Sequence, residues 1–123
     1  MMSNKTIWYG AGIVLVVAIA AAIVLRNAGS ASEEKLTPFA QCLTERGVVI
    51  YGTYSCPYCR KQKDLFGDAF RFVTYVECTQ ESARCVADNV QSIPLWVFPS
   101  GDRLVGLQSL ETLSVKSGCA LPQ

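Results

Sequence analysis

The stretch VVIYGTYSCPYCRKQKDLF, residues 48–66, determines both the fold and the candidate chemistry of this chain. Its first four residues are apolar and typical of a buried strand, and the residues from Pro57 onward favour a helix with a proline in its first turn. Cys56 and Cys59 lie at the junction, two residues apart. The positive N-terminal end of the helix would favour negative charge on the first sulfur. This arrangement predicts a thiol-disulfide redox site, with Cys56 as the exposed nucleophile and Cys59 as the more buried resolving thiol.

Other interpretations of a CxxC pair are a zinc site and a structural disulfide. A four-coordinate zinc ion needs two further ligands, but the chain has no histidine, and its remaining cysteines form no second CxxC. Closing so short a loop would also constrain little entropy in the unfolded chain. We therefore favour redox chemistry and expect neither a bound metal nor a cofactor.

The N-terminal quarter of the chain has a different character from the rest. The 123 residues suffice for one small domain, and a net charge of +1 gives no indication of a nucleic-acid partner. Residues 7–25 are apolar and uncharged, and a helix of about 19 residues nearly crosses a ~30 Å hydrocarbon core. We expect an uncleaved transmembrane anchor at 1–26, a linker at 27–35 and a folded domain at 36–123. The alternative is a signal peptide cleaved near Ala31 or Ser32, although its apolar region would normally be shorter.

The folded domain is expected to alternate helices with strands. Thr37 and Pro38 are typical of a helix N-cap and first helical residue, and Gly47 would end that helix. The pattern then predicts strands at 48–53, 70–77, 95–98 and 103–106, and helices at 57–66, 81–89 and 109–118. On the helix at 57–66 we expect these charged side chains to face solvent: Arg60, Lys61, Lys63 and Asp64.

This order of elements predicts a mixed sheet. Strands separated by helices should pair in parallel, and the last two strands should form an antiparallel hairpin. The expected α/β architecture is the thioredoxin fold, a central mixed four-stranded sheet flanked by helices, with one extra N-terminal helix and a single transmembrane helix before it.

Motifs outside the CxxC pair are more specific. They are FAQCL at 39–43, CPYCRKQKDLFG at 56–67, YVEC at 75–78 and SGC at 117–119. Together they resemble the thioredoxin-like domain of the bacterial and plant homologues of vitamin K epoxide reductase, over almost all of residues 38–119. The resemblance implies a protein that shuttles disulfides between secreted proteins and a quinone-reducing membrane enzyme. One span cannot hold that four-helix enzyme, so we expect a vitamin K epoxide reductase-like membrane protein as a separate partner.

A proline further along the chain supports the same interpretation. In thioredoxin-like folds a cis-proline packs beside the CxxC pair, and Ile93-Pro94 lies at the matching place, about 35 residues after Cys59. We expect a substrate groove lined by Tyr54, Pro57, Tyr58, Ile93 and Pro94. The alternative for Pro94 is an ordinary proline at the start of a strand.

Four cysteines remain outside the CxxC pair. Cys42 and Cys119 lie on the first helix and just after the last, and Cys78 and Cys85 flank a short loop. We expect the structural disulfides Cys42–Cys119 and Cys78–Cys85, whereas the alternative is a relay that passes electrons to the CxxC pair. Six cysteines in a small domain suit an oxidising space, so we expect the domain on the extracytoplasmic side of the inner, or cytoplasmic, membrane.

These observations predict a membrane-tethered thiol-disulfide oxidoreductase that exchanges disulfides with the cysteine thiols of other proteins. Two alternatives stay open. One is a reductase or isomerase that acts on extracytoplasmic thiols, and the other is a non-catalytic binding module with the same fold. The direction of electron flow does not follow from these residues.

Overall fold

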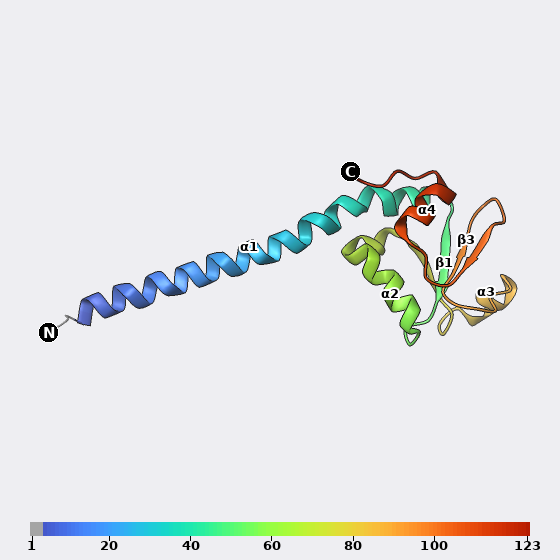
Figure 1. The fold of residues 1–123 in the computed structure, drawn as a ribbon. Coiled ribbons are helices and arrows are strands. Elements are labelled where there is room, and N and C mark those ends of the chain that lie inside the picture. Colours follow the sequence, from blue (N-terminus) through green and yellow to red (C-terminus); the bar gives the residue numbers. More distant parts are fainter. Residues whose placement is uncertain (1–3) are drawn as a thin grey trace. The chain divides into compact units, whose positions relative to one another are not determined.

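The computed structural model describes the backbone of residues 4–123 and the side chains of residues 7–26 and 34–123. The chain divides into two compact units, Met1–Ser32 and Glu33–Gln123. Its first helix, α1, runs from Asn4 to Glu45 (Figure 1).

The N-terminal part of α1 is a candidate membrane span. Ile7–Arg26 is the one helical segment within the described residues that is long and apolar enough to cross a membrane, with a mean hydropathy of 2.5. None of it is buried against other parts of the chain. A helix that is apolar on all sides needs an apolar environment around it, so this segment could serve as a membrane anchor.

The start of the first domain helix differs from the prediction. Thr37 and Pro38 do not begin a helix, because α1 already includes Pro38 and also residues 27–35, for which we expected a linker. Leu36, Phe39, Ala40 and Leu43 follow the helical period across Pro38, and they belong to the main core cluster or pack against it. This packing favours a continuous helix, although the proline lacks the N–H for one backbone hydrogen bond.

The unit Glu33–Gln123 is built around a mixed sheet with the strand order β2-β1-β3-β4. Its strands are β1 (Val49–Gly52), β2 (Thr74–Glu77), β3 (Leu95–Val97) and β4 (Arg103–Val105). Strand β1 pairs in parallel with β2 and antiparallel with β3, and β3 forms an antiparallel hairpin with β4. The predicted mixed four-stranded sheet is confirmed, and with its flanking helices the fold is thioredoxin-like. The expectation that strands separated by helices pair in parallel is correct for β1 and β2 but wrong for β3, which follows α3 and pairs antiparallel with β1.

Helices cover both faces of this sheet. Figure 1 shows α2 (Pro57–Phe66) and α4 (Leu110–Ser117) on one side and α3 (Ser82–Ala87) on the other. Side chains alternate between the faces along β1. Ile50 belongs to the larger core cluster with Phe66 and Trp96, whereas Tyr51 belongs to a smaller cluster with Cys85. Helix α2 thus packs on the main core and is held firmly against the sheet.

One predicted strand is shorter than expected. Residues 67–72 form a 3-10 helix, η1 (Gly67–Phe72), and the strand begins only at Thr74. The alternation of apolar and polar residues suggested a strand from Phe70. Instead, Phe70 packs edge-on against both Phe66 and Tyr75, at centroid distances of 5.9 and 5.7 Å. This aromatic contact requires the chain to turn back towards α2.

Candidate functional site at the CxxC pair

Cys56 is the N-cap residue of α2, directly after the turn that follows β1. Its backbone is extended, Pro57 takes the first helical position, and its sulfur accepts a hydrogen bond from the backbone N–H of Cys59 at 3.2 Å. The first N–H groups of a helix lack partners within the helix, and here one of them points at the sulfur. Cys56 is partly exposed and carries no disulfide. A thiol or disulfide of another molecule can therefore reach it.

Cys59 lies one turn into α2 and is completely buried, also without a disulfide. Burial and, next, the hydrogen bond with Cys56 raise the pKa of the Cys59 thiol from its ordinary value of about 9 to about 11. Removing water disfavours the charged form of a thiol. At neutral pH Cys59 is therefore a protonated thiol next to an accessible sulfur, which is the asymmetry predicted for the pair.

The other four cysteines are joined in two disulfides. Cys42 of α1 bonds to Cys119 after α4, and Cys78 after β2 bonds to Cys85 of α3, each with a Cα–Cα distance of 5.8 Å. These are the pairings expected from the sequence. No group of three or more His, Cys, Asp or Glu side chains that could hold a metal occurs among the described residues.

The structure places the residues expected to line a groove in two segments. Tyr54 and Tyr58 flank Cys56 and expose 68% and 58% of their surfaces. The Ile93–Pro94 peptide bond is cis. Pro94 itself is buried, and its carbonyl accepts a hydrogen bond from the Gly106 N–H at 2.8 Å. Large, exposed aromatic side chains beside an accessible sulfur are suited to contact a polypeptide.

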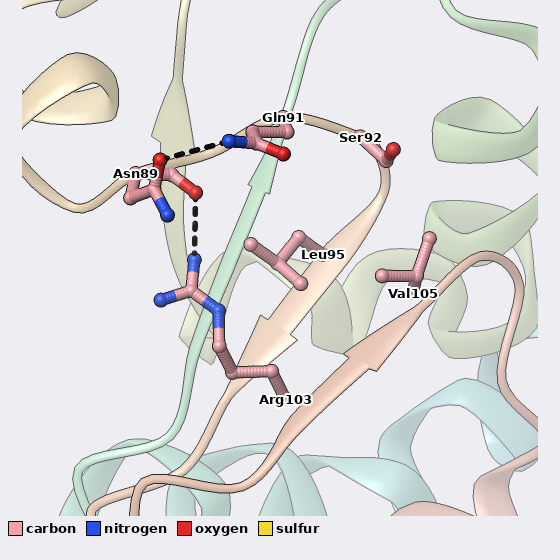
Figure 2. A pocket seen from close by; sticks show the side chains of 6 residues that line it. All are labelled: Asn89, Gln91, Ser92, Leu95, Arg103 and Val105. Carbon is pink, nitrogen blue, oxygen red and sulfur yellow. Dashed lines mark hydrogen bonds between the residues drawn. The ribbon is translucent and has the colours of Figure 1, made fainter.

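A separate pocket of about 270 Å³ lies beside the segment that leads into Ile93. Figure 2 shows its lining: Asn89, Gln91, Ser92, Leu95, Arg103 and Val105. The Arg103 guanidinium donates to the backbone carbonyls of Asp88 and Asn89, at 2.8 and 3.2 Å. Neither cysteine of the CxxC pair lines this pocket, so the pocket is distinct from the candidate site.

Gln62 is a buried polar residue of α2 that the sequence analysis did not single out as a site residue. Its side-chain oxygen accepts from the Trp96 indole at 3.2 Å and from the Gln108 backbone N–H at 2.7 Å. Its side-chain nitrogen donates to the Gln108 carbonyl at 3.0 Å. Gln62 therefore ties the helix that carries both cysteines to β3 and to the segment before α4. Gln62 lies three residues after Cys59, on the buried face of the helix. A polar residue at such a position indicates a buried hydrogen-bonding role.

Lys63 corrects the prediction of a fully solvated charged face on α2. It is half-buried, and its Nζ lies 3.8 Å from the centroid of the Tyr75 ring. The Tyr75 hydroxyl donates to the Glu77 carboxylate at 2.8 Å. Burial acts to raise the pKa of Glu77, but hydrogen bonds from Thr79 and Tyr75 lower it overall. Tyr75 and Glu77 of β2 therefore form a charged and aromatic cluster next to α2. From the alternation of apolar and polar residues alone, they are predicted only to belong to a strand.

Comparison with known proteins agrees with this chemistry. No protein-family model matches the chain. The chain is 27% identical over 103 residues to the thiol-disulfide oxidoreductase LTO1 of Arabidopsis thaliana, and the alignment covers 76% of this chain and 27% of LTO1. The chain thus spans about a quarter of the length of that relative. The thioredoxin-like fold, the disulfide-forming cysteines and this similarity together support an oxidoreductase of the thiol-disulfide class.

Proposed function

We propose that the protein is a membrane-tethered thiol-disulfide oxidoreductase that exchanges disulfides with the cysteine thiols of other proteins through Cys56 and Cys59. The asymmetry between the two cysteines is the main support for this function. Cys56 presents an accessible sulfur at a helix N-terminus, and Cys59 lies buried directly behind it, with its backbone N–H on that sulfur. The similarity to a thiol-disulfide oxidoreductase supports the same chemistry.

The reaction follows from the positions of the two sulfurs. When the pair is reduced, the Cys56 thiolate attacks a disulfide of a partner protein and forms a mixed disulfide, and one partner sulfur leaves as a thiolate. Cys59 then attacks the Cys56 sulfur and releases the second partner thiol. When the pair is oxidised, a partner thiolate attacks Cys56 and the same steps run in reverse, so that the partner becomes oxidised. The two directions share one site and differ only in which side holds the disulfide at the start.

The substrate is a polypeptide, contacted by Tyr54, Pro57 and Tyr58 around Cys56 and by the Ile93–Pro94 segment. The exposure of both tyrosines supports this part of the proposal. A partner protein presents its disulfide as part of a polypeptide chain. The surface around Cys56 must therefore be shallow enough to admit that chain, and a deep cavity is not needed.

We further propose that the domain lies on the extracytoplasmic side of the cytoplasmic membrane, anchored by residues 7–26. The two disulfides outside the CxxC pair support an oxidising space. The resemblance of the motifs at 39–43, 56–67 and 75–78 leads us to propose a vitamin K epoxide reductase-like membrane protein as the electron-accepting partner.

Trapping of mixed disulfides tests the function. In Cys59→Ser the resolving thiol is absent, so partner proteins should accumulate as disulfide-linked adducts of Cys56 on non-reducing gels. The double variant with Cys56→Ser as well should trap nothing. Adducts that survive Cys56→Ser but require Cys59 would reverse the two roles, and a complete lack of adducts and of disulfide-reducing activity would favour a non-catalytic binding module.

The resting state of the pair distinguishes oxidase from reductase. Thiol alkylation in intact cells should find Cys56–Cys59 mainly oxidised if the protein supplies disulfides. A mainly reduced pair would instead indicate a reductase or an isomerase. The same cells report the topology, because protease added outside the membrane should digest the domain only if it is extracytoplasmic.

A further inference from the structure

The reaction proposed above requires the buried Cys59 thiol to lose its proton. Burial and the contact with Cys56 raise its pKa to about 11, so only a small fraction is thiolate at neutral pH. The thiolate is the nucleophile in disulfide exchange. A positive charge near Cys59 would increase that fraction and speed the release of the partner.

Cys59 of α2 lies close to Gly52 of β1 and Tyr75 of β2. A methyl group on Gly52 would lie 2.9 Å from the Cys59 sulfur and 3.3 Å from the Tyr75 hydroxyl oxygen, so only glycine lets these groups pack this closely. Tyr75 of β2 therefore reaches the same point as the buried sulfur. The titratable groups that act on Cys59 and on Tyr75 are Cys56 and Lys63 from α2 and Glu77 from β2.

Lys63 is the one positive charge in this group. It follows Cys59 by four residues, so the two side chains lie on the same face of α2. Its ammonium is held over the Tyr75 ring at 3.8 Å and near the Phe70 ring at 5.5 Å, in cation–π contacts. Burial is the largest influence on Cys59 and raises its pKa, whereas the Lys63 charge lowers it.

The Tyr75 ring is itself fixed in place. Its hydroxyl donates to Glu77 at 2.8 Å, and its edge packs against Phe70. Burial and the hydrogen bond to Glu77 raise the pKa of Tyr75 well above its ordinary value, so it stays neutral at physiological pH. Tyr75 is therefore a neutral aromatic support that holds Lys63 near Cys59.

We propose that Lys63 is an electrostatic positioning residue whose ammonium, held on the Tyr75 ring, stabilises the Cys59 thiolate that resolves the mixed disulfide. This inference rests on the proposed thiol-disulfide exchange. In the resolving step the Cys59 thiol gives its proton to solvent, and its sulfur forms a bond to the Cys56 sulfur. The bond between Cys56 and the partner sulfur breaks, and the partner leaves as a thiolate. The cysteine pair is oxidised and the partner is reduced.

The resolving step can be measured alone. Reduced full-length protein in detergent is treated with dithiobis(nitrobenzoate) at low pH, so that Cys56 carries one thionitrobenzoate group. A rapid jump to higher pH then lets Cys59 release that group, and the absorbance of free thionitrobenzoate gives the rate. Cys59→Ser, which cannot resolve, provides the blank.

We expect Lys63→Met and Lys63→Gln to slow this release by up to about tenfold at neutral pH, because each pKa unit changes the thiolate fraction tenfold and a nearby opposite charge shifts a pKa by about one unit or more. The deficit should shrink as the pH approaches 11, where Cys59 ionises without help. Lys63→Arg should retain most of the rate. Tyr75→Phe should also retain it, because the ring remains, whereas Tyr75→Leu should resemble Lys63→Met.

Lys61→Met is the matched control. Lys61 is on the same helix and also lies over a tyrosine ring, that of Tyr58, at 5.3 Å, so its removal costs the same charge without affecting Cys59. An equal loss in Lys61→Met, a loss that is constant with pH, or no loss in the Lys63 variants would overturn the inference. A wild-type protein that keeps its thionitrobenzoate at every pH would instead refute the proposed function itself.

Discussion

The two disulfides outside the CxxC pair should differ in how much they stabilise the domain. Cys42–Cys119 closes a loop with a sequence separation of 77, and Cys78–Cys85 closes one of 7. A cross-link lowers the entropy of the unfolded chain by an amount that grows with the logarithm of loop length. That relation gives about 4.5 kcal/mol for the long loop and about 2.5 kcal/mol for the short one.

The two disulfides have similar surroundings, so the effects of removing them on stability can be compared directly. Each disulfide joins one buried cysteine, Cys119 or Cys85, to one that is partly buried. Replacing both members of a pair by alanine therefore leaves a similar small cavity in either case, and the cavity contributions nearly cancel. The difference of about 2 kcal/mol then reflects loop length. A domain of this size has a total stability of about 5–15 kcal/mol, so removal of the long-loop disulfide should take a large share of it.

Urea unfolding measures this difference. The full-length protein has two tryptophans, and a Trp8→Phe background leaves the buried Trp96 as the reporter. With m of about 2 kcal/mol/M, typical of small proteins, the Cys42→Ala/Cys119→Ala variant should unfold about 1 M urea earlier than Cys78→Ala/Cys85→Ala. Equal midpoints, or the reverse order at unchanged m, would refute the chain-entropy reasoning and point to local contacts of the short loop instead.

Two further predictions concern the interior beneath the CxxC pair. Gln62→Leu should lower the free energy of unfolding by roughly 2–4 kcal/mol, because the Trp96 indole and the Gln108 N–H would lose their acceptor; a loss below 1 kcal/mol in urea unfolding would contradict this role. The reduced protein should lose stability as the pH rises from about 9 towards 11. The native state keeps the Cys59 proton there while the unfolded state releases it. Cys59→Ala should show a weaker pH dependence, and identical slopes for the two proteins would rule the explanation out.

Local sequence patterns predicted most of the framework. The apolar run before Cys56, the proline after it and the caps of α4 at Ser109 and Gly118 each follow from short-range preferences of the backbone, and the structure has these elements where they were expected. The alternation of helices with strands also predicted the parallel pairing of β1 with β2. It did not predict that β3, which follows α3, pairs antiparallel with β1. The correctly predicted features depend on neighbours within a few residues, which is the information that a sequence displays directly.

The sequence misled where two local signals competed. Thr37-Pro38 is a normal helix start, but α1 passes through it, because Leu36, Phe39 and Ala40 pack on the core at helical spacing on both sides of the proline. Phe70 and Phe72 alternate as in a strand, yet both lie in η1, where the Phe70 ring packs against Phe66 and Tyr75. Where two local preferences are of similar strength, tertiary packing determines which structure forms, and the sequence does not show that packing.

The sequence by itself determined the candidate pair, Cys56 and Cys59, and its setting at a strand-to-helix junction, because two cysteines, a proline and their flanking periodicity are contiguous. The surroundings of the buried Cys59 were decided only by the tertiary structure. Parallel pairing sets Gly52 opposite Glu77, so that β2 brings Tyr75 close to Gly52 and Cys59. The packing of α2 places Lys63 over the Tyr75 ring. Residues separated by 12 or more positions meet there through sheet register and helix packing, which are properties of the whole fold.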